Sequence, residues 1–112
     1  MSTMRNSVMM IGRPTKPVMN SEENKASFKL AVTESYKSGG CCAPRTFTFD
    51  CVANGEMANQ VVKKVEEGRL LAIDGSLRCY DYQDRVGDTH THTEIEVNDL
   101  FLIDGRRAKR WN

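Results

Sequence analysis

The feature that most constrains this chain is the spacing of its apolar residues. In most segments apolar and polar residues alternate one by one, a pattern that places one face of a β-strand on a core and exposes the other. The alternating segments are 26–33, 46–53, 71–79 and 94–97, and a short apolar run at 8–11 ends at Gly12 and Pro14. The sequence therefore predicts five strands.

One segment, between the third and fourth predicted strands, has helical spacing instead. Its apolar stripe consists of Met57, Val61, Val62 and Val65. The spacing predicts a helix of about three turns. Asn54 is the expected N-cap residue, Glu56 suits the first turn, and Gly68 is expected to end the helix. Five strands with one helix between the third and fourth indicate an all-β fold of the OB type, a five-stranded barrel that commonly binds oligonucleotides.

Length and composition are those of one globular domain. The chain has 112 residues, of which 39% are hydrophobic and 28% charged, which excludes a disordered chain and a membrane span. We expect one OB-fold domain over 1–105 and a short basic tail over 106–112. The tail holds four positive charges and the only tryptophan, on a chain of net charge +1. No secretory signal is present at the start, so a cytoplasmic location is expected.

The sequence contains none of the motifs typical of nucleotide-binding loops, hydrolases or metalloproteases, so we expect neither an enzyme nor a cofactor. The four cysteines lack a C-x-x-C pair. The spacing of the four cysteines is unfavourable for binding one metal ion. We therefore expect Cys51 and Cys79 to be buried in the core and Cys41 and Cys42 to be loop thiols.

His90 and His92 share one face of a predicted strand, and Glu94 and Glu96 continue it. This set allows two interpretations, a surface metal site or a solvated strand face near a hairpin. With only two histidines and no second cluster of ligands, the second interpretation is favoured, and no metal site is predicted.

A different pattern points to binding. Arg78, Tyr80 and Tyr82 recur at every second position of the fourth predicted strand, opposite Leu77 and Cys79. Single-stranded nucleic acid needs such a face, because bases stack on aromatic rings and phosphates pair with Lys and Arg. The alternative is that these tyrosines are ordinary strand residues that pack against neighbours or a subunit.

Further residues of the same two kinds lie near the loop between the second and third predicted strands. Tyr36 stands where the second strand leaves the barrel, Lys37 follows it, and Arg45 enters the third strand. We include all three in the candidate nucleic-acid site.

Several stretches match the residues and the spacing of a known protein family. They are NSVMMIGR (6–13), FKLAVTESY (28–36), CVANG (51–55), GRLLAIDGSLR (68–78) and the hairpin 82–97. Over about 6–103 the chain resembles the bacterial single-stranded DNA-binding proteins, an OB-fold family that usually assembles as a homotetramer. The resemblance implies single-stranded DNA, further copies of the chain and replication proteins as partners. It implies base stacking at Tyr36 and Tyr82 and basic contacts at Arg78 and Arg13.

The chain departs from this family in three respects. Thr48 and Asn54 stand where the family usually has aromatic residues. Acidic residues stand where the family often has cations, namely Asp50, Glu56, Glu67 and Asp81. The end is short and basic, where cellular members carry a long tail with an acidic tip. These departures indicate a phage, plasmid or accessory form, with Trp111 either an extra stacking ring or part of an unstructured end.

The sequence thus predicts sequence-independent binding of single-stranded DNA by base stacking and phosphate pairing, in DNA replication, recombination or repair. The alternative is an OB-fold interaction module of a replication or primosome assembly with weak nucleic-acid binding. RNA binding is a third hypothesis, because OB barrels also bind RNA.

Overall fold

The computed structural model of the chain describes residues 4–38 and 41–103. The elements in these residues are β1 (Val8–Pro14), β2 (Val18–Asn20), β3 (Lys25–Ser38), β4 (Cys41–Asn54), α1 (Glu56–Lys64), β5 (Leu71–Gln83) and β6 (Thr89–Leu102). All five predicted strands and the helix are present in the predicted order. The sequence did not predict β2, because three residues are too few to show an alternating pattern.

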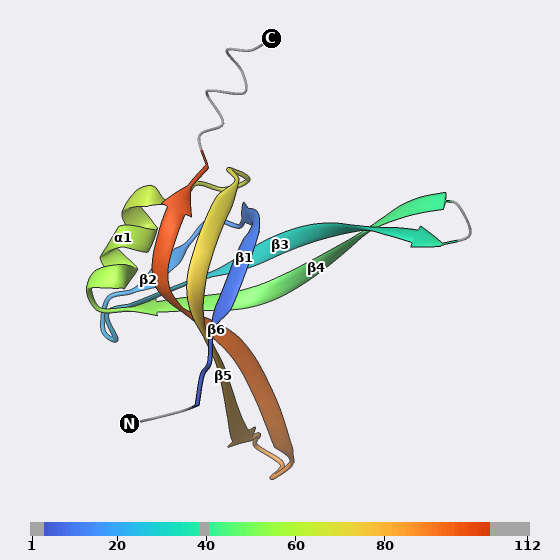
Figure 1. Cartoon of the computed structure of the whole chain (residues 1–112). Helices are drawn as coiled ribbons and strands as arrows, with labels where there is room; N and C mark the ends of the chain where they lie inside the picture. Colours follow the sequence, from blue (N-terminus) through green and yellow to red (C-terminus); the bar gives the residue numbers. More distant parts are fainter. Residues whose placement is uncertain (1–3, 39–40, 104–112) are drawn as a thin grey trace.

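The strands form one sheet in the order β1-β5-β6-β4-β3-β2, which closes on itself because β1 also pairs with β3. Neighbouring strands are antiparallel except for β4 and β6, which run parallel where Cys51 pairs with Ile95. The predicted five-stranded barrel, with its helix between the third and fourth barrel strands, is confirmed. In Figure 1, β3 and β4 extend beyond the barrel as one long arm, and β5 and β6 extend from it in another direction as a second arm.

The core consists of the inward-facing residues of the alternating segments, closed at one end by α1. Its fully buried members are Ala26, Leu30, Cys51, Ala53, Ala58, Val61, Leu71 and Ile73. Burial raises the pKa of the Cys51 thiol to about 12, as expected for a cysteine inside an apolar core. Of the predicted apolar stripe, Val61 on α1 and Val65 directly after it are buried as predicted, whereas Val62 is exposed and Ala58 takes the inward position instead.

Both predictions for the ends of the helix are wrong. Asn54 is still the last residue of β4, and Gly55, with φ 62° and ψ −129°, is the N-cap. This backbone conformation favours glycine, which explains why a residue without a capping side chain begins the helix. The helix ends at Lys64 with Val65 as its C-cap, so Gly68 lies in the following turn rather than at the helix end.

A bulge separates the barrel part of β5 from its arm. Asp74 pairs with Asp99 and Gly75 pairs with Val97, so Asn98 has no partner across the strand pair. At Gly75 a Cβ atom would lie 2.2 Å from the carbonyl oxygen of Glu96, closer than any real contact. Glycine is therefore required at this point because two backbones approach each other.

The prediction that Leu77 and Cys79 face the core is wrong, since both are exposed. The alternation continues past Ile73, but the strand leaves the barrel after the bulge. The inward face of the arm then has no barrel beneath it, so apolar residues there stay accessible.

Candidate nucleic-acid interface

Arg78, Tyr80 and Tyr82 come together on one face of the β5–β6 arm, as predicted. Tyr80 is 47% exposed and Tyr82 is 54% exposed, so both rings are accessible. Across the strand pair, Tyr80 lies opposite His92 and Tyr82 lies opposite His90. The face therefore carries four rings in two cross-strand pairs, which we call the ring ladder (Tyr80, Tyr82, His90 and His92).

The rings of each pair are in mutual contact. Tyr80 and His92 are stacked, with ring centroids 6.3 Å apart and planes inclined by 18°. Tyr82 and His90 are closer, at 5.4 Å, and tilted by 31°. The sequence analysis placed the histidines on this face but assigned them no role, because their partners become visible only once the strand register is known.

A carboxylate anchors each pair. The Tyr80 hydroxyl donates a hydrogen bond to Glu94, which also lies 3.1 Å from His92 Nε2 and is only 5% exposed. Asp84 holds His90 Nε2 at 2.7 Å. The hydrogen bond to Glu94 raises the pKa of Tyr80, and the hydrogen bond with His90 lowers the pKa of Asp84. Each of the two histidine rings on β6 is thus held in place by a carboxylate.

Arg78 is already paired with an acid. Its Nε donates to Glu96 Oε1 at 2.8 Å, and the other oxygen of Glu96 accepts a hydrogen bond from Asn54 at 3.3 Å. Partly exposed ion pairs of this kind contribute only about 0–1 kcal/mol. Exchange of Glu96 for another anion at Arg78 would therefore cost little.

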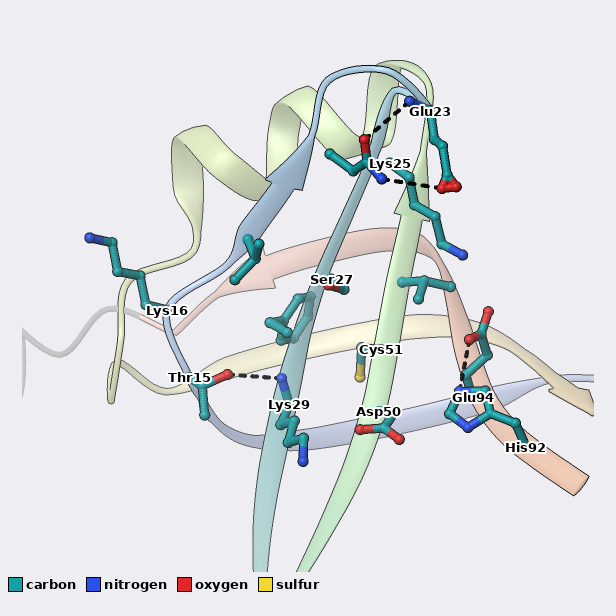
Figure 2. A pocket seen from close by; sticks show the side chains of 14 residues that line it. Thr15, Lys16, Glu23, Lys25, Ser27, Lys29, Asp50, Cys51, His92 and Glu94 are labelled. Atoms are coloured by element: carbon teal, nitrogen blue, oxygen red, sulfur yellow. Dashed lines mark hydrogen bonds and ion pairs between the residues drawn. The ribbon is translucent and has the colours of Figure 1, made fainter. Parts of the chain in front are cut away.

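A groove of about 650 Å³ lies on the outer face of β3 and β4 and reaches the ring ladder. Figure 2 shows Lys29 and Asp50 on neighbouring strands, with His92 and Glu94 entering from β6. The charged residues that line it are Lys16, Glu23, Lys25, Lys29, Asp50 and Glu94. The groove and the ladder form one continuous surface, because His92 belongs to both and Glu94, which holds Tyr80 and His92, also lines the groove.

The sequence analysis missed the lysines of this groove. Lys29 stands at an outward position of an alternating strand, which is a signal that it is exposed, but nothing in the sequence shows that Lys16 and Lys25 share its surface. Of the acids noted as departures, Asp50 lies in the groove. Asp81 instead faces away from the ring ladder, where its carboxylate accepts a hydrogen bond from Thr91 at 2.9 Å.

Of the remaining predicted site residues, Arg13 and Arg45 do not join this surface. Arg13 donates a hydrogen bond to the carbonyl of Gly68 at 2.8 Å, which ties it to the turn after α1. Arg45 is exposed on the β3–β4 arm, opposite Glu34. Tyr36 and Lys37 belong to β3 by their backbone, but their side chains and the whole of Trp111 lie outside what the structure describes.

Within residues 4–38 and 41–103, no group of three or more His, Cys, Asp or Glu residues is placed to hold a metal ion. In the same part of the chain α1 is the sole helix, and its nine residues are too few to cross a bilayer.

Comparison with known proteins gives a consistent result. Residues 5–103 match the family described as "Single-strand binding protein family". The single-stranded DNA-binding protein of Caldanaerobacter subterraneus subsp. tengcongensis is 31% identical over 105 residues, which are 90% of this chain and 69% of the relative. That of Staphylococcus epidermidis is 31% identical over 103 residues, covering 89% and 77% respectively.

Two solved structures share the fold. A small single-stranded DNA-binding protein from Streptomyces coelicolor superposes with a TM-score of 0.70 at 23% identity, over 93% of this chain and 99% of the other. The single-stranded DNA-binding protein of Plasmodium falciparum in complex with single-stranded DNA gives 0.78 at 22% identity, over 92% and 98%. These likenesses confirm the predicted OB-type barrel.

Proposed function

The chain belongs to the single-strand binding protein family, and we propose that it binds single-stranded DNA along the ring ladder and the adjoining groove. The family match covers nearly the whole described chain, so the resemblance inferred from the sequence is confirmed, and with it single-stranded DNA as the ligand. The observation that carries the placement is the continuity of exposed rings with a lysine-lined groove.

The surface suits binding without reading of base sequence. Each base that stacks on an aromatic ring gains roughly 1–3 kcal/mol whatever its identity, because every base has a π-face. Phosphates pair with Lys16, Lys25, Lys29 and Arg78. The protein covers the strand and catalyses no reaction on it.

A fluorescence-anisotropy titration of labelled oligo-dT tests this function. We expect tighter binding to the single strand than to a matched duplex, and an affinity that falls with salt. Each neutralised phosphate contributes about −0.7 to the slope of log affinity against log salt, so the three groove lysines contribute about −2 at most. The neighbouring carboxylates, such as Asp50, make the slope shallower.

A triple variant, Lys16→Gln, Lys25→Gln and Lys29→Gln, should flatten this slope. The control is Lys63→Gln with Lys64→Gln, which removes two exposed lysines from the last turn of α1, outside the groove. Equal affinity for single strand and duplex, or a slope that the groove variant leaves unchanged, would contradict the placement.

The acids on this surface favour one alternative. Glu96 forms an ion pair with Arg78, and Asp50 and Glu94 line the groove. These negative charges oppose the binding of phosphate. If oligo-dT does not bind at low salt, the surface is better explained as an interaction module of a replication or primosome assembly. Competition between matched DNA and RNA oligonucleotides separates DNA binding from RNA binding.

The outer face of β1, β5 and β6 supports self-assembly. Ile11, Ala72 and Phe101 form one row across the three strands, and Ile11 and Phe101 are 52% and 50% exposed. Met9, in the next row, is 71% exposed. In the described residues β1 pairs with β3 only through Arg13 and Pro14. An exposed apolar patch beside an open strand edge is typical of an interface between subunits, and we propose a homotetramer.

Light scattering of the purified protein at micromolar concentration should give a mass near four chains. Ile11→Glu places a charge in the middle of the apolar row and should lower this mass. Val86→Glu is the matched control, because Val86 is an equally apolar and highly exposed residue in the β5–β6 turn. A single-chain mass for the unaltered protein would refute the proposal.

The cellular role follows the family. We propose that the protein acts in the cytoplasm in DNA replication, recombination or repair, as a phage, plasmid or accessory form, with replication proteins as further partners. The barrel domain is proposed to span 1–105. The basic tail 106–112, with Trp111 as an added contact for the strand, lies outside the described residues.

A further inference from the structure

The chain contains two histidines, and both are members of the ring ladder. We propose that His90 and His92 are nucleobase-stacking residues whose protonation strengthens binding, so that the protein takes up protons when it binds a single strand. The inference rests on the proposed function and adds to it a specific role for the two histidines of the ladder and a dependence on pH.

Neighbouring side chains already hold both imidazole rings in position for stacking. Each lies against a tyrosine ring, and each has its Nε2 fixed by a carboxylate, His90 by Asp84 and His92 by Glu94. Both side chains remain about half exposed, so a base can reach them. A ring that is held in place before binding loses less conformational freedom when a base stacks on it.

The charges on the ladder explain why protonation matters. Arg78 supplies one positive charge against the negative charges of Asp84, Glu94 and Glu96. With neutral histidines the face carries a net charge of minus two, which repels phosphate. With both histidines protonated the net charge is zero.

The groups around the histidines do not outweigh this change. His90 faces Tyr82 and Asp84. His92 faces Tyr80 and Glu94, and it shares the groove with Asp50 and Glu23 as well as Lys16, Lys25 and Lys29. The groove thus holds three lysines against three carboxylates, one of which, Glu94, also belongs to the charges counted on the ladder. With Glu94 counted once, groove and ladder together carry a net charge of minus one when both histidines are neutral and plus one when both are protonated.

The composition of the chain simplifies the test, because His90 and His92 are the two histidines of the sequence. Histidine ordinarily titrates near pH 6.5, whereas carboxyl groups titrate well below and amino groups and thiols above. The pKa of Asp84 is lowered and the pKa of Cys51 is raised to about 12, which moves both further from this range. A change in affinity between about pH 5.5 and about pH 7 is therefore assigned to His90 and His92 if it disappears when both are replaced.

The experiment compares three proteins with labelled oligo-dT at fixed ionic strength. They are the unaltered chain, the double variant His90→Gln with His92→Gln, and the double variant His90→Phe with His92→Phe. Phenylalanine keeps a ring but cannot be protonated, and glutamine has neither property. Circular dichroism checks that each variant is folded, which we expect because both histidines lie at the surface.

For the unaltered chain we expect a gain of a few-fold per histidine, on the order of tenfold for both, between about pH 7 and about pH 5.5. The salt slope should steepen by about 0.7 per histidine over the same interval. The Phe variant should match the unaltered chain at about pH 7 and show no gain. The Gln variant should show no gain and bind roughly tenfold or more weakly at both values.

Two results overturn the inference while leaving strand binding intact. One is a pH gain that persists in both variants, and the other is a Gln variant that binds like the unaltered chain at neutral pH. If the unaltered chain binds oligo-dT at neither pH, the proposed function and this inference fall together. The two failures are therefore distinguishable in one data set.

Discussion

Replacing Tyr80 and Tyr82 together with alanine is expected to weaken single-strand binding by about 2–6 kcal/mol, the sum of two stacking contributions of roughly 1–3 kcal/mol each. Both rings are exposed on one face of the arm and both belong to the ring ladder. Anisotropy titration of oligo-dT at low salt measures the loss. Unchanged affinity in a folded double variant would remove the ladder from the binding site.

Two controls separate stacking from structural damage. Tyr80→Phe removes only the hydroxyl that donates to Glu94 and should bind within a few-fold of the unaltered chain, because the ring remains. Cys79→Ala with Thr93→Ala alters a cross-strand pair on the opposite face of the same arm. That variant should leave binding unchanged, whereas an equal loss would show that the arm as a whole is being perturbed.

Replacing Gly75 with alanine is expected to lower the free energy of unfolding by about 1–3 kcal/mol or more, the range found for overpacking of a filled interior. The added Cβ would meet the backbone carbonyl of Glu96, which cannot turn aside as a flexible side chain could. Urea unfolding followed by circular dichroism gives the change in midpoint and slope.

Asn98→Ala is the control for this substitution. Asn98 is the residue of the same bulge that has no partner in the strand register. It is exposed, and its side chain donates a hydrogen bond to Ser76 Oγ at 3.3 Å. We expect its replacement to change stability by less than about 0.5 kcal/mol. If Gly75→Ala unfolds at the same urea concentration as the unaltered protein, then the strands can separate here without cost and the requirement for glycine is refuted.

The sequence predicts the barrel well because alternation reports directly on which side chains are inside. Phe28 and Leu30 on β3 and Ile73 on β5 are buried as their positions require. The same rule fails at Leu77 and Cys79, since period two says which face a residue is on but not where the core ends. The prediction of the helix N-cap is wrong for a related reason. The N-cap position has a backbone conformation that favours glycine, so Gly55 begins the helix without a capping side chain.

The site is predictable only in part. Positions two apart on one strand share a face, so the grouping of Arg78, Tyr80 and Tyr82 follows from the sequence. The partners of Tyr80 and Tyr82 depend on the hairpin register, which the bulge at Gly75 shifts by one residue relative to the barrel. The groove lysines meet through closure of the barrel, and no local pattern records that closure.

The β5–β6 arm has a consequence for the motions of the molecule. From Leu77 to Gln83 every side chain of β5 is exposed, so this stretch is secured chiefly by its hydrogen bonds to β6. Backbone amides there should exchange their hydrogens through openings of the arm alone, while those near Leu30 and Ile73 exchange only when the barrel unfolds. The rings that we propose to contact a strand thus lie on a part of the molecule that is expected to open while the barrel stays folded. We therefore expect a bound strand to be released without loss of the fold.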